Sequence, residues 1–207
     1  MAEKQDDRYV RRLHRTSLPV GAVELAKYLI GKTLVHDTPA GRTSGRIVET
    51  EAYVVGDAAG HAYRGYTPRN KSLFLECGHA YVYRAYGLHF LVNISSEIRG
   101  VGAGVLLRAL EPLDGIHLMQ LRRAHSSLID LARGPGRLAQ AMGISLWHDG
   151  LDLCAAGPLW LGEAVRRVGE IARSVRIGIS RDTHRLLRFY ERGSPYVSGP
   201  KRSKEQP

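Results

Sequence analysis

The chain has 207 residues, of which 43% are hydrophobic, so it can bury a substantial core, and one domain is expected. No apolar run is long enough to cross a membrane, and the charged N-terminus lacks the apolar segment of a signal peptide, so we expect an intracellular protein. Thirty Lys and Arg against 20 Asp and Glu give a net charge of +10, which favours a polyanionic partner such as nucleic acid. Two cysteines are too few for a disulfide framework or a Cys-rich zinc site, and the nine histidines lack metal-binding spacing, so no metal is expected.

Periodicity and turn residues predict the following elements. In chain order they are a helix over 20–29, a strand over 32–36, a turn at 38–41, a strand over 49–53, a helix start at 67–68, strands over 80–85, 88–94 and 105–110, helices over 114–124 and 138–142, and strands over 159–161, 175–179 and 186–190. Strands outnumber helices, and their spacing is typical of hairpins rather than of βαβ crossovers. We therefore expect an α+β fold: one domain over residues 17–198 with a mainly antiparallel sheet, a mobile N-terminal segment over 1–16 and a disordered basic tail over 199–207.

The strand predicted around Ile47 carries a concentration of chemically capable side chains. Side chains two positions apart share a face of a strand, so Glu49, Glu51 and Tyr53 should point the same way. Two carboxylates and an aromatic ring would then converge on one surface. A solvated strand face is the alternative interpretation.

Two further features concern a turn and a helix start. Tyr86-Gly87 separates two predicted strands, where glycine supplies the positive φ of a tight turn, so Tyr86 stands at an exposed tip or folds back on its sheet. The Arg-Gly-Pro-Gly-Arg run over 133–137 precedes a predicted helix, and is either a phosphate seat or a plain turn.

Arg108 is the single charge inside the apolar strand predicted over 105–110. A buried arginine needs a carboxylate partner, and either Glu51 or Glu111 could supply it.

A series of motifs follows in order along residues 17–198. They are GRIVETEAY at 45–53, TPRN at 67–70, YVY at 81–83, YG at 86–87, NISS at 93–96, VLLRALEP at 105–112, GPGRL at 134–138, RIGI at 176–179 and LRFYERGSP at 187–195. Together they resemble the alkyladenine (3-methyladenine) DNA glycosylases of the vertebrate type. The resemblance implies a curved sheet with a protruding β-hairpin and surrounding helices.

The resemblance also implies an activity. It is that of a monofunctional enzyme that flips alkylated or deaminated purines out of duplex DNA and hydrolyses the N-glycosidic bond with an activated water, initiating base excision repair. The purines concerned are 3-methyladenine, 7-methylguanine, hypoxanthine and ethenoadenine. We expect double-stranded DNA containing a damaged purine as partner, no cofactor, no membrane, and a monomer. The expected location is the cytoplasm, at the nucleoid in a bacterium, or the nucleus in a eukaryote.

Site residues follow from the same resemblance. The catalytic residues are Glu51, as the general base that activates water, and Arg108, which helps to hold that water. The substrate-binding residues are Tyr53, His61, Tyr83, Asn93 and Ile177, the last through its backbone. The DNA-binding residues are Tyr86, Gly87, Leu88, Arg69 and Arg137, among which Tyr86 is the wedge that fills the gap in the duplex.

The chain departs from the vertebrate pattern near the pocket. The loop before His61 and the link to Thr67 are shorter, the loop keeps Asp57 as its one acid, and Gly104 replaces a larger residue. These differences affect the substrate range rather than the reaction.

Two other functions fit part of the sequence. Glu49 and Glu51 could be the acid and base of a nucleoside or glycoside hydrolase, because their Cα atoms would lie roughly 6.5–7 Å apart on a strand. The chain could also be a non-catalytic sensor of distorted DNA. A structural salt bridge is otherwise the expected use of Glu49.

Overall fold

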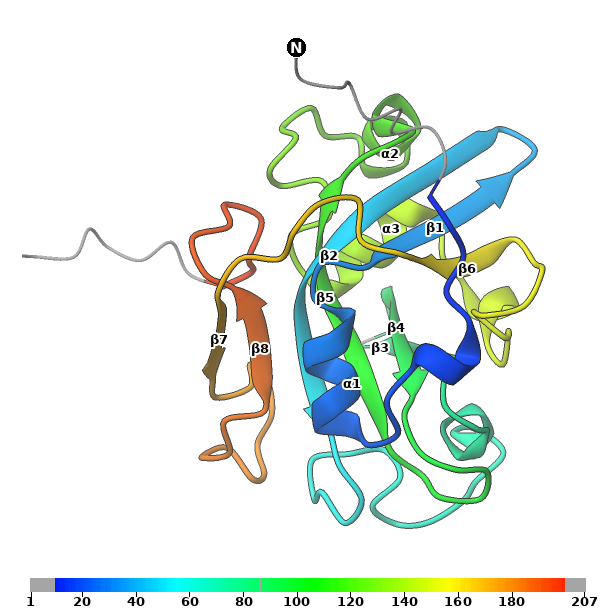
Figure 1. Ribbon diagram of the computed structural model, residues 1–207, viewed down its shortest axis with the longest axis vertical. Helices are drawn as coiled ribbons and strands as arrows, with labels where there is room; N and C mark the ends of the chain where they lie inside the picture. Colours follow the sequence, from blue (N-terminus) through cyan, green and yellow to red (C-terminus); the bar gives the residue numbers. More distant parts are fainter. Residues whose placement is uncertain (1–9, 86, 200–207) are drawn as a thin grey trace, which may run out of the picture.

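The computed structural model describes residues 10–85 and 87–199 (Figure 1). Its strands are β1 (Thr33–Thr38), β2 (Gly41–Tyr53), β3 (Ala80–Ala85), β4 (His89–Ser95), β5 (Gly104–Pro112), β6 (Leu159–Gly162), β7 (Ile171–Ser174) and β8 (Arg188–Glu191). Its α-helices are α1 (Ala22–Leu29), α2 (Ile116–Arg123) and α3 (Pro135–Met142), and short 3-10 helices cover Arg15–Ser17, Lys71–Phe74 and Leu146–His148. No helix in this described part is long and apolar enough to span a membrane.

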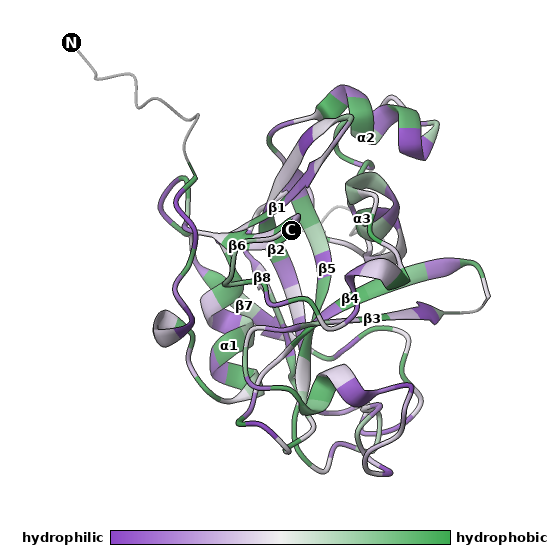
Figure 2. Ribbon diagram, turned by 90° about the vertical axis from the view of Figure 1, so that its right-hand side faces the viewer, coloured by the Kyte–Doolittle hydropathy of each residue, from purple (hydrophilic) through white to green (hydrophobic). Residues whose placement is uncertain are grey.

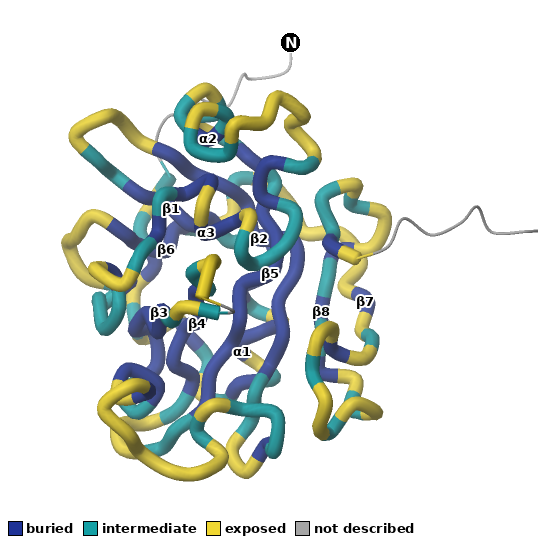
Figure 3. Tube along the Cα trace, turned by 180° about the vertical axis from the view of Figure 1, so that it is seen from behind, coloured by how far each residue is buried: buried dark blue, intermediate teal, exposed yellow. Residues whose placement is uncertain are grey.

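The sheet is built around β2, its longest described strand. The strands lie in the order β3-β4-β5-β2-β1-β6, and every pairing is antiparallel. The first part of β2 pairs with β1, whereas Glu49–Glu51 pairs with β8, which in turn pairs with β7. Figure 3 shows that β2 and β5 are buried along most of their length. The α+β fold with a curved, mainly antiparallel sheet in a single domain is confirmed.

Helices cover the sheet on different sides. In α1, Ala22, Leu25, Ala26 and Leu29 are buried at helical spacing and pack on β2 and β5. Helix α3 packs against β4 and β5, and α2 packs on α3. The β3–β4 hairpin projects from this body, as Figure 2 shows, so the protruding hairpin is also confirmed.

Most predicted elements lie close to their expected bounds. The helices expected over 20–29, 114–124 and 138–142 are α1, α2 and α3. The strands expected over 32–36, 80–85, 88–94, 105–110, 159–161 and 186–190 are β1, β3, β4, β5, β6 and β8. The turn at 38–41 is confirmed by the pairing of Thr38 with Gly41, and β2 starts directly after it.

Two predictions of secondary structure are wrong. Thr67 does not begin an α-helix: Thr67 N–H donates to the Asn70 side chain, the Asn70 amide group bonds the His61 and Gly65 carbonyls, and only a 3-10 helix follows. Residues 175–179 form a loop rather than a strand. The Arg176 guanidinium bonds the Asp57 carboxylate, and the Ile177 N–H donates to the Glu51 carboxylate instead of to the backbone of a neighbouring strand.

The predicted terminal segments are only partly described. Residues 1–9 and 200–207 lie outside the described residues. From Val10 onward the N-terminal segment is packed on the sheet: Arg12 pairs with Gly162 of β6, and Leu13 is buried.

Two buried histidines make stability depend on pH. His36 Nδ1 donates to the Met142 carbonyl at 2.6 Å, and its Nε2 lies 3.1 Å from Nε2 of His148, whose Nδ1 accepts the Ser145 N–H. This arrangement needs one proton on each ring, so a second proton on either ring breaks the chain. Burial lowers the pKa of both rings; for His36 the Met142 carbonyl opposes this and the His148 ring adds to it.

We predict that the free energy of unfolding falls as pH drops below 6.5, the ordinary histidine pKa, and levels off below the folded-state pKa values. The sign follows because the unfolded chain binds more protons than the folded chain in that window. Urea unfolding at pH 5–7.5 measures it, and His148→Gln should flatten the dependence. Exposed His117→Gln is the control; an equal slope in both variants would contradict the assignment.

Candidate active site

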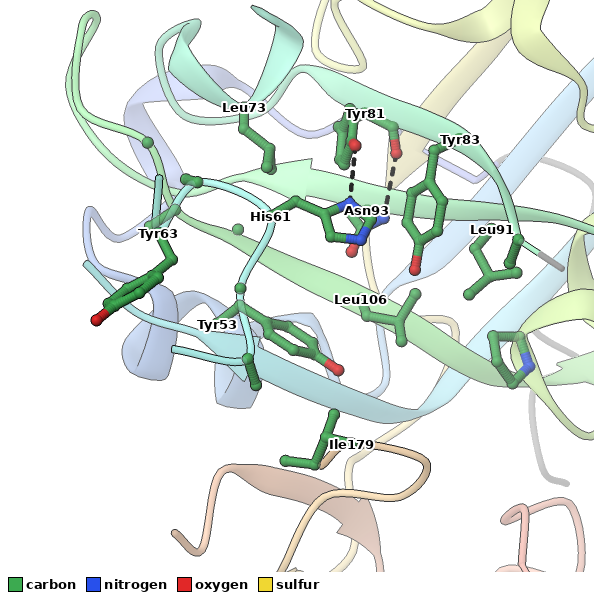
Figure 4. A pocket seen from close by; sticks show the side chains of 18 of the residues that line it. Tyr53, His61, Tyr63, Leu73, Tyr81, Tyr83, Leu91, Asn93, Leu106 and Ile179 are labelled. Atoms are coloured by element: carbon green, nitrogen blue, oxygen red, sulfur yellow. Dashed lines mark hydrogen bonds between the residues drawn. The ribbon is translucent and has the colours of Figure 1, made fainter. Parts of the chain in front are cut away.

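A cavity of about 480 Å³ lies between β2, β3, β4, β5 and three loops, which contribute residues within 54–69, 102–103 and 177–179 (Figure 4). This volume lies within the range of small-molecule sites, roughly 300–1,000 Å³. Its lining is largely aromatic and aliphatic with a few polar groups, and includes Tyr53, His61, Leu73, Tyr81, Tyr83, Asn93, Gly104, Leu106, Arg108, Ile177 and Ile179.

One wall of the cavity is a set of aromatic rings. Tyr81 and Tyr83 project from the same face of β3 and stack with centroids 5.4 Å apart, and the His61 ring lies 4.4 Å from that of Tyr83. His61 Nδ1 is 2.8 Å from the Tyr81 hydroxyl, which fixes the imidazole. Tyr53 lies on the opposite side (Figure 4). The cavity therefore has the form of a slot between rings, suited to a flat heterocycle.

The surroundings of the His61 ring disfavour its protonated form. Burial lowers the pKa of His61, and the nearby Arg69 guanidinium lowers it further. The imidazole is therefore neutral near pH 7, with one nitrogen able to donate and one able to accept a hydrogen bond.

Glu51 is fully buried behind three groups that line the cavity. Its Oε1 accepts the Ile177 N–H at 2.8 Å and lies 3.2 Å from Arg108 Nη1, and its Oε2 accepts the Tyr53 hydroxyl at 3.1 Å. Burial raises the pKa of Glu51; Arg108 and the two hydrogen bonds oppose that rise, and Glu49 adds to it. A carboxyl with a raised pKa that lies directly behind the lining of a cavity is a candidate general acid or base.

Arg108 joins the two acids of β2. Its Nε donates to Glu49 Oε1 at 2.9 Å, while Nη1 faces Glu51. Of the two partners predicted for Arg108, Glu51 is confirmed, whereas Glu111 is wrong because its carboxylate pairs with Arg46 and Arg166. The pairing register of β2 and β5 shifts at this point and skips Arg108, and such irregularities re-aim side chains near functional sites.

Glu49 and Glu51 share the face that the alternation predicts, and neither acid is exposed to solvent, so a solvated strand face is wrong. Glu49 makes the structural salt bridges expected of it, to Arg108 and Arg188.

A second buried ion pair supports Tyr53. Arg176 binds both carboxylate oxygens of Asp57, donates to the Ala52 carbonyl and lies 4.6 Å from the centre of the Tyr53 ring. Arg176 and Asp57 are both fully buried at their side chains. The shortened loop before His61 is therefore anchored to the strand that carries Glu51 and Tyr53.

The other predicted residues lie around the cavity or at the hairpin. Asn93 and Arg69 line the cavity, and Asn93 Nδ2 donates to the Tyr81 carbonyl. Gly87 has a φ of +69° at the hairpin turn, and Leu88 beside it is 78% exposed; Tyr86 lies outside the described residues.

Arg137 lies apart from that set. It is on α3, its side chain is half exposed, and its guanidinium lies 3.3 Å from the Asp130 carboxylate. The 133–137 run contains the start of this helix, which begins at Pro135 after Gly134.

Several lining or supporting residues escaped sequence reasoning. Tyr81 could have been found, because it lies two positions from Tyr83 on one strand face. Leu106 and Ile179 gave no signal beyond ordinary hydrophobicity. Arg188 and Ser198, which bind Glu49, lie about 140–150 residues further along the chain, and sequence spacing says nothing of such contacts.

The sequence is similar to those of known proteins. Residues 17–195 match the model of the methylpurine-DNA glycosylase (MPG) family, so the chain belongs to that family. It is 62% identical over 191 residues to a protein of Mesorhizobium japonicum, with 92% of each chain covered, and 53% identical over 190 residues to one of Paraburkholderia phytofirmans, with 92% and 89% covered. A protein of Methanoculleus marisnigri is 47% identical over 180 residues, covering 85% and 93%. All three are named "Putative 3-methyladenine DNA glycosylase".

We predict that Asp57→Ala destabilises the protein by about 3–5 kcal/mol, because Arg176 would keep a buried charge without its carboxylate. Chemical denaturation measures the change. Glu170→Ala is the control, since Glu170 and Arg192 form an exposed pair worth at most about 1 kcal/mol. Equal effects of the two substitutions would contradict the role of the buried pair.

Proposed function

We propose that this protein is a monofunctional DNA glycosylase that removes damaged purines from duplex DNA in the cytoplasm and so starts base excision repair. The observation that carries the proposal is the buried Glu51, which is bonded by Arg108, Ile177 and Tyr53, three residues that line an aromatic slot. A base inside a duplex cannot be reached, so an enzyme of this kind must extrude it and bind it in such a slot.

Glu51 keeps one hydrogen-bond acceptor position that a water molecule could fill. Its two oxygens offer about four acceptor positions, of which Oε1 uses two, for Ile177 and Arg108, and Oε2 uses one, for Tyr53. Among the described residues this leaves one position on Oε2, beside the Tyr53 hydroxyl. A water held there can lose a proton to Glu51 as it attacks the sugar carbon.

Charge at the site suits the bond that breaks. As the purine leaves, the sugar gains oxocarbenium character, and a nearby carboxylate stabilises that positive charge. Burial raises the pKa of Glu51, and the Arg108 guanidinium opposes that rise by favouring the ionised form. Tyr53, by contrast, remains a neutral donor, because burial and Glu51 raise the pKa of its hydroxyl.

Specificity would come from the slot walls. Tyr83 and His61 on one side and Tyr53 on the other can stack on a flipped purine, and Asn93 borders it. The proposed substrates of the slot are 3-methyladenine, 7-methylguanine, hypoxanthine and ethenoadenine.

Duplex contact is proposed for the hairpin and for the basic rim. Exposed Leu88 at the hairpin turn, with Gly87 and Tyr86, would enter the base stack, with Tyr86 as the wedge. Arg69 at the cavity and Arg137 on α3 would meet phosphates, in keeping with the charge of +10. The proposed unit is a monomer.

The hydrolase that would use Glu49 and Glu51 as acid and base is disfavoured. Glu49 accepts hydrogen bonds from Arg108, Arg188 and Ser198 through both its oxygens, whereas Glu51 keeps an unfilled acceptor position. The Glu49 carboxylate therefore has no acceptor position left to bind a substrate.

The test is release of hypoxanthine from a duplex oligonucleotide, read as an abasic site, with free nucleosides as the control. Base release from the duplex alone supports the proposal. Lesion binding with no release would favour a DNA sensor, and cleavage of free nucleosides would favour the hydrolase.

Glu51→Gln should keep lesion binding, because the shape of the side chain survives, but lose the general base. We predict that the single-turnover rate falls by at least the ~10²–10⁴ that general-base catalysis contributes. Fluorescence anisotropy checks binding, and a rate near wild type would refute the role of Glu51.

A water mechanism also predicts that no covalent protein–DNA adduct forms. No lysine is among the residues that line the described cavity, so the site offers no amine to form a Schiff base. Borohydride added during turnover should therefore trap no adduct, and a stable adduct above the no-enzyme background would overturn the mechanism.

A further inference from the structure

Ser198 lies at the C-terminal end of the described chain, beyond β8, yet it is buried beside the candidate active site. Its hydroxyl donates to Glu49 Oε1 at 2.9 Å and accepts a hydrogen bond from Arg108 Nη2 at 3.2 Å. Its backbone N–H donates to Glu49 Oε2 at 2.6 Å, and its carbonyl accepts from Arg188 at 2.8 Å. Ser198 thus bonds side chains from β2, β5 and β8 at once.

Each nitrogen of the Arg108 guanidinium has a different partner. Nε is taken by Glu49 and Nη2 by Ser198, which leaves Nη1 to face Glu51. A guanidinium is planar, so fixing two of its nitrogens fixes the direction of the third. Glu49 is itself held by Arg188, so the brace on Arg108 is anchored in three strands.

We propose that Ser198 is a positioning residue for the proposed glycosylase reaction: by bracing Arg108 and Glu49, it fixes the arginine that faces the catalytic carboxylate. The inference rests on the proposed function and extends it. The C-terminal segment after β8 is then part of the catalytic apparatus, although it does not touch the bound base.

Loss of the brace should change how Glu51 titrates. The groups facing Glu51 are Arg108 from β5, Glu49 and Tyr53 from β2, and the Ile177 N–H, while Arg188 on β8 reaches it through Glu49. If Arg108 moves freely, the ionised form of Glu51 loses its main stabilising charge. The acid side of the pH–rate profile should then move to higher pH.

The decisive variant is Ser198→Ala, which removes the hydroxyl and keeps the backbone bonds. Ser194→Ala is the matched control, because Ser194 lies in the same segment and, among the described residues, its hydroxyl bonds only the Tyr196 N–H. Ser198→Thr restores a hydroxyl and tests rescue. The assay measures single-turnover base release against pH, with affinity for a duplex carrying an uncleavable abasic-site analogue measured separately.

We expect Ser198→Ala to slow base release by at least about 10-fold, because its hydroxyl makes two hydrogen bonds to charged groups, Glu49 and Arg108. The acid limb should move to higher pH, affinity should change by less than twofold, and Ser198→Thr should recover most of the rate. Wild-type rate and acid limb in Ser198→Ala would overturn the proposal. So would a rate loss that comes only with lower affinity and melting temperature and leaves the acid limb in place.

Two measurements keep this result separate from the proposed function and from folding. If the wild-type enzyme releases no base, the function is wrong, and a crystal structure of Ser198→Ala tests the brace by itself: Arg108 should turn away from Glu51. If Ser198→Ala does not fold, Ser198→Cys keeps a weaker donor of similar size and should show a smaller shift of the same sign.

Discussion

The structure depends on a buried cluster of four charges at the middle of the sheet. Glu49, Glu51, Arg108 and Arg188 come from three neighbouring strands, and the four side chains are at most 11% exposed. Burying ions costs several kcal/mol each unless their hydrogen bonds are satisfied, so the strands have to meet in one register. The ion cluster therefore sets the pairing of β5 and β8 on β2, and the cavity walls follow from that pairing.

The two acids of the cluster have different surroundings, although they lie two residues apart. Glu49 accepts hydrogen bonds from two arginines and from both the N–H and the hydroxyl of Ser198, so its carboxylate has a structural role. Glu51 is bonded by a single arginine, a backbone N–H and a phenol, and all three of these groups belong to residues that line the cavity. One strand thus supplies both a structural carboxylate and the carboxylate that we propose as the general base, and Arg108 connects them.

Sequence reasoning reached the features that depend on local periodicity. Alternation on β2 placed Glu49, Glu51 and Tyr53 together, and Gly87 marked the hairpin turn. It failed where a distant group competed for the backbone. Residues 175–179 have a strand-like composition, but the Ile177 N–H bonds a carboxylate 126 residues away instead of a neighbouring strand. No local pattern distinguishes these outcomes, because the competing partner is brought there only by the completed fold.

The same dependence on context governs the shape of the slot. A Cβ added to Gly104 would lie 2.8 Å from Leu73 Cδ2, which is closer than real Cβ contacts, and 3.0 Å from the Ile94 carbonyl oxygen, which is at the tight end of their range. A larger residue at this position, as in the vertebrate pattern, therefore requires a different side chain or rotamer at Leu73. Both residues line the cavity, so the two positions together set its width. Because the pair must change together, substrate preference cannot be transferred from a relative by comparing position 104 alone.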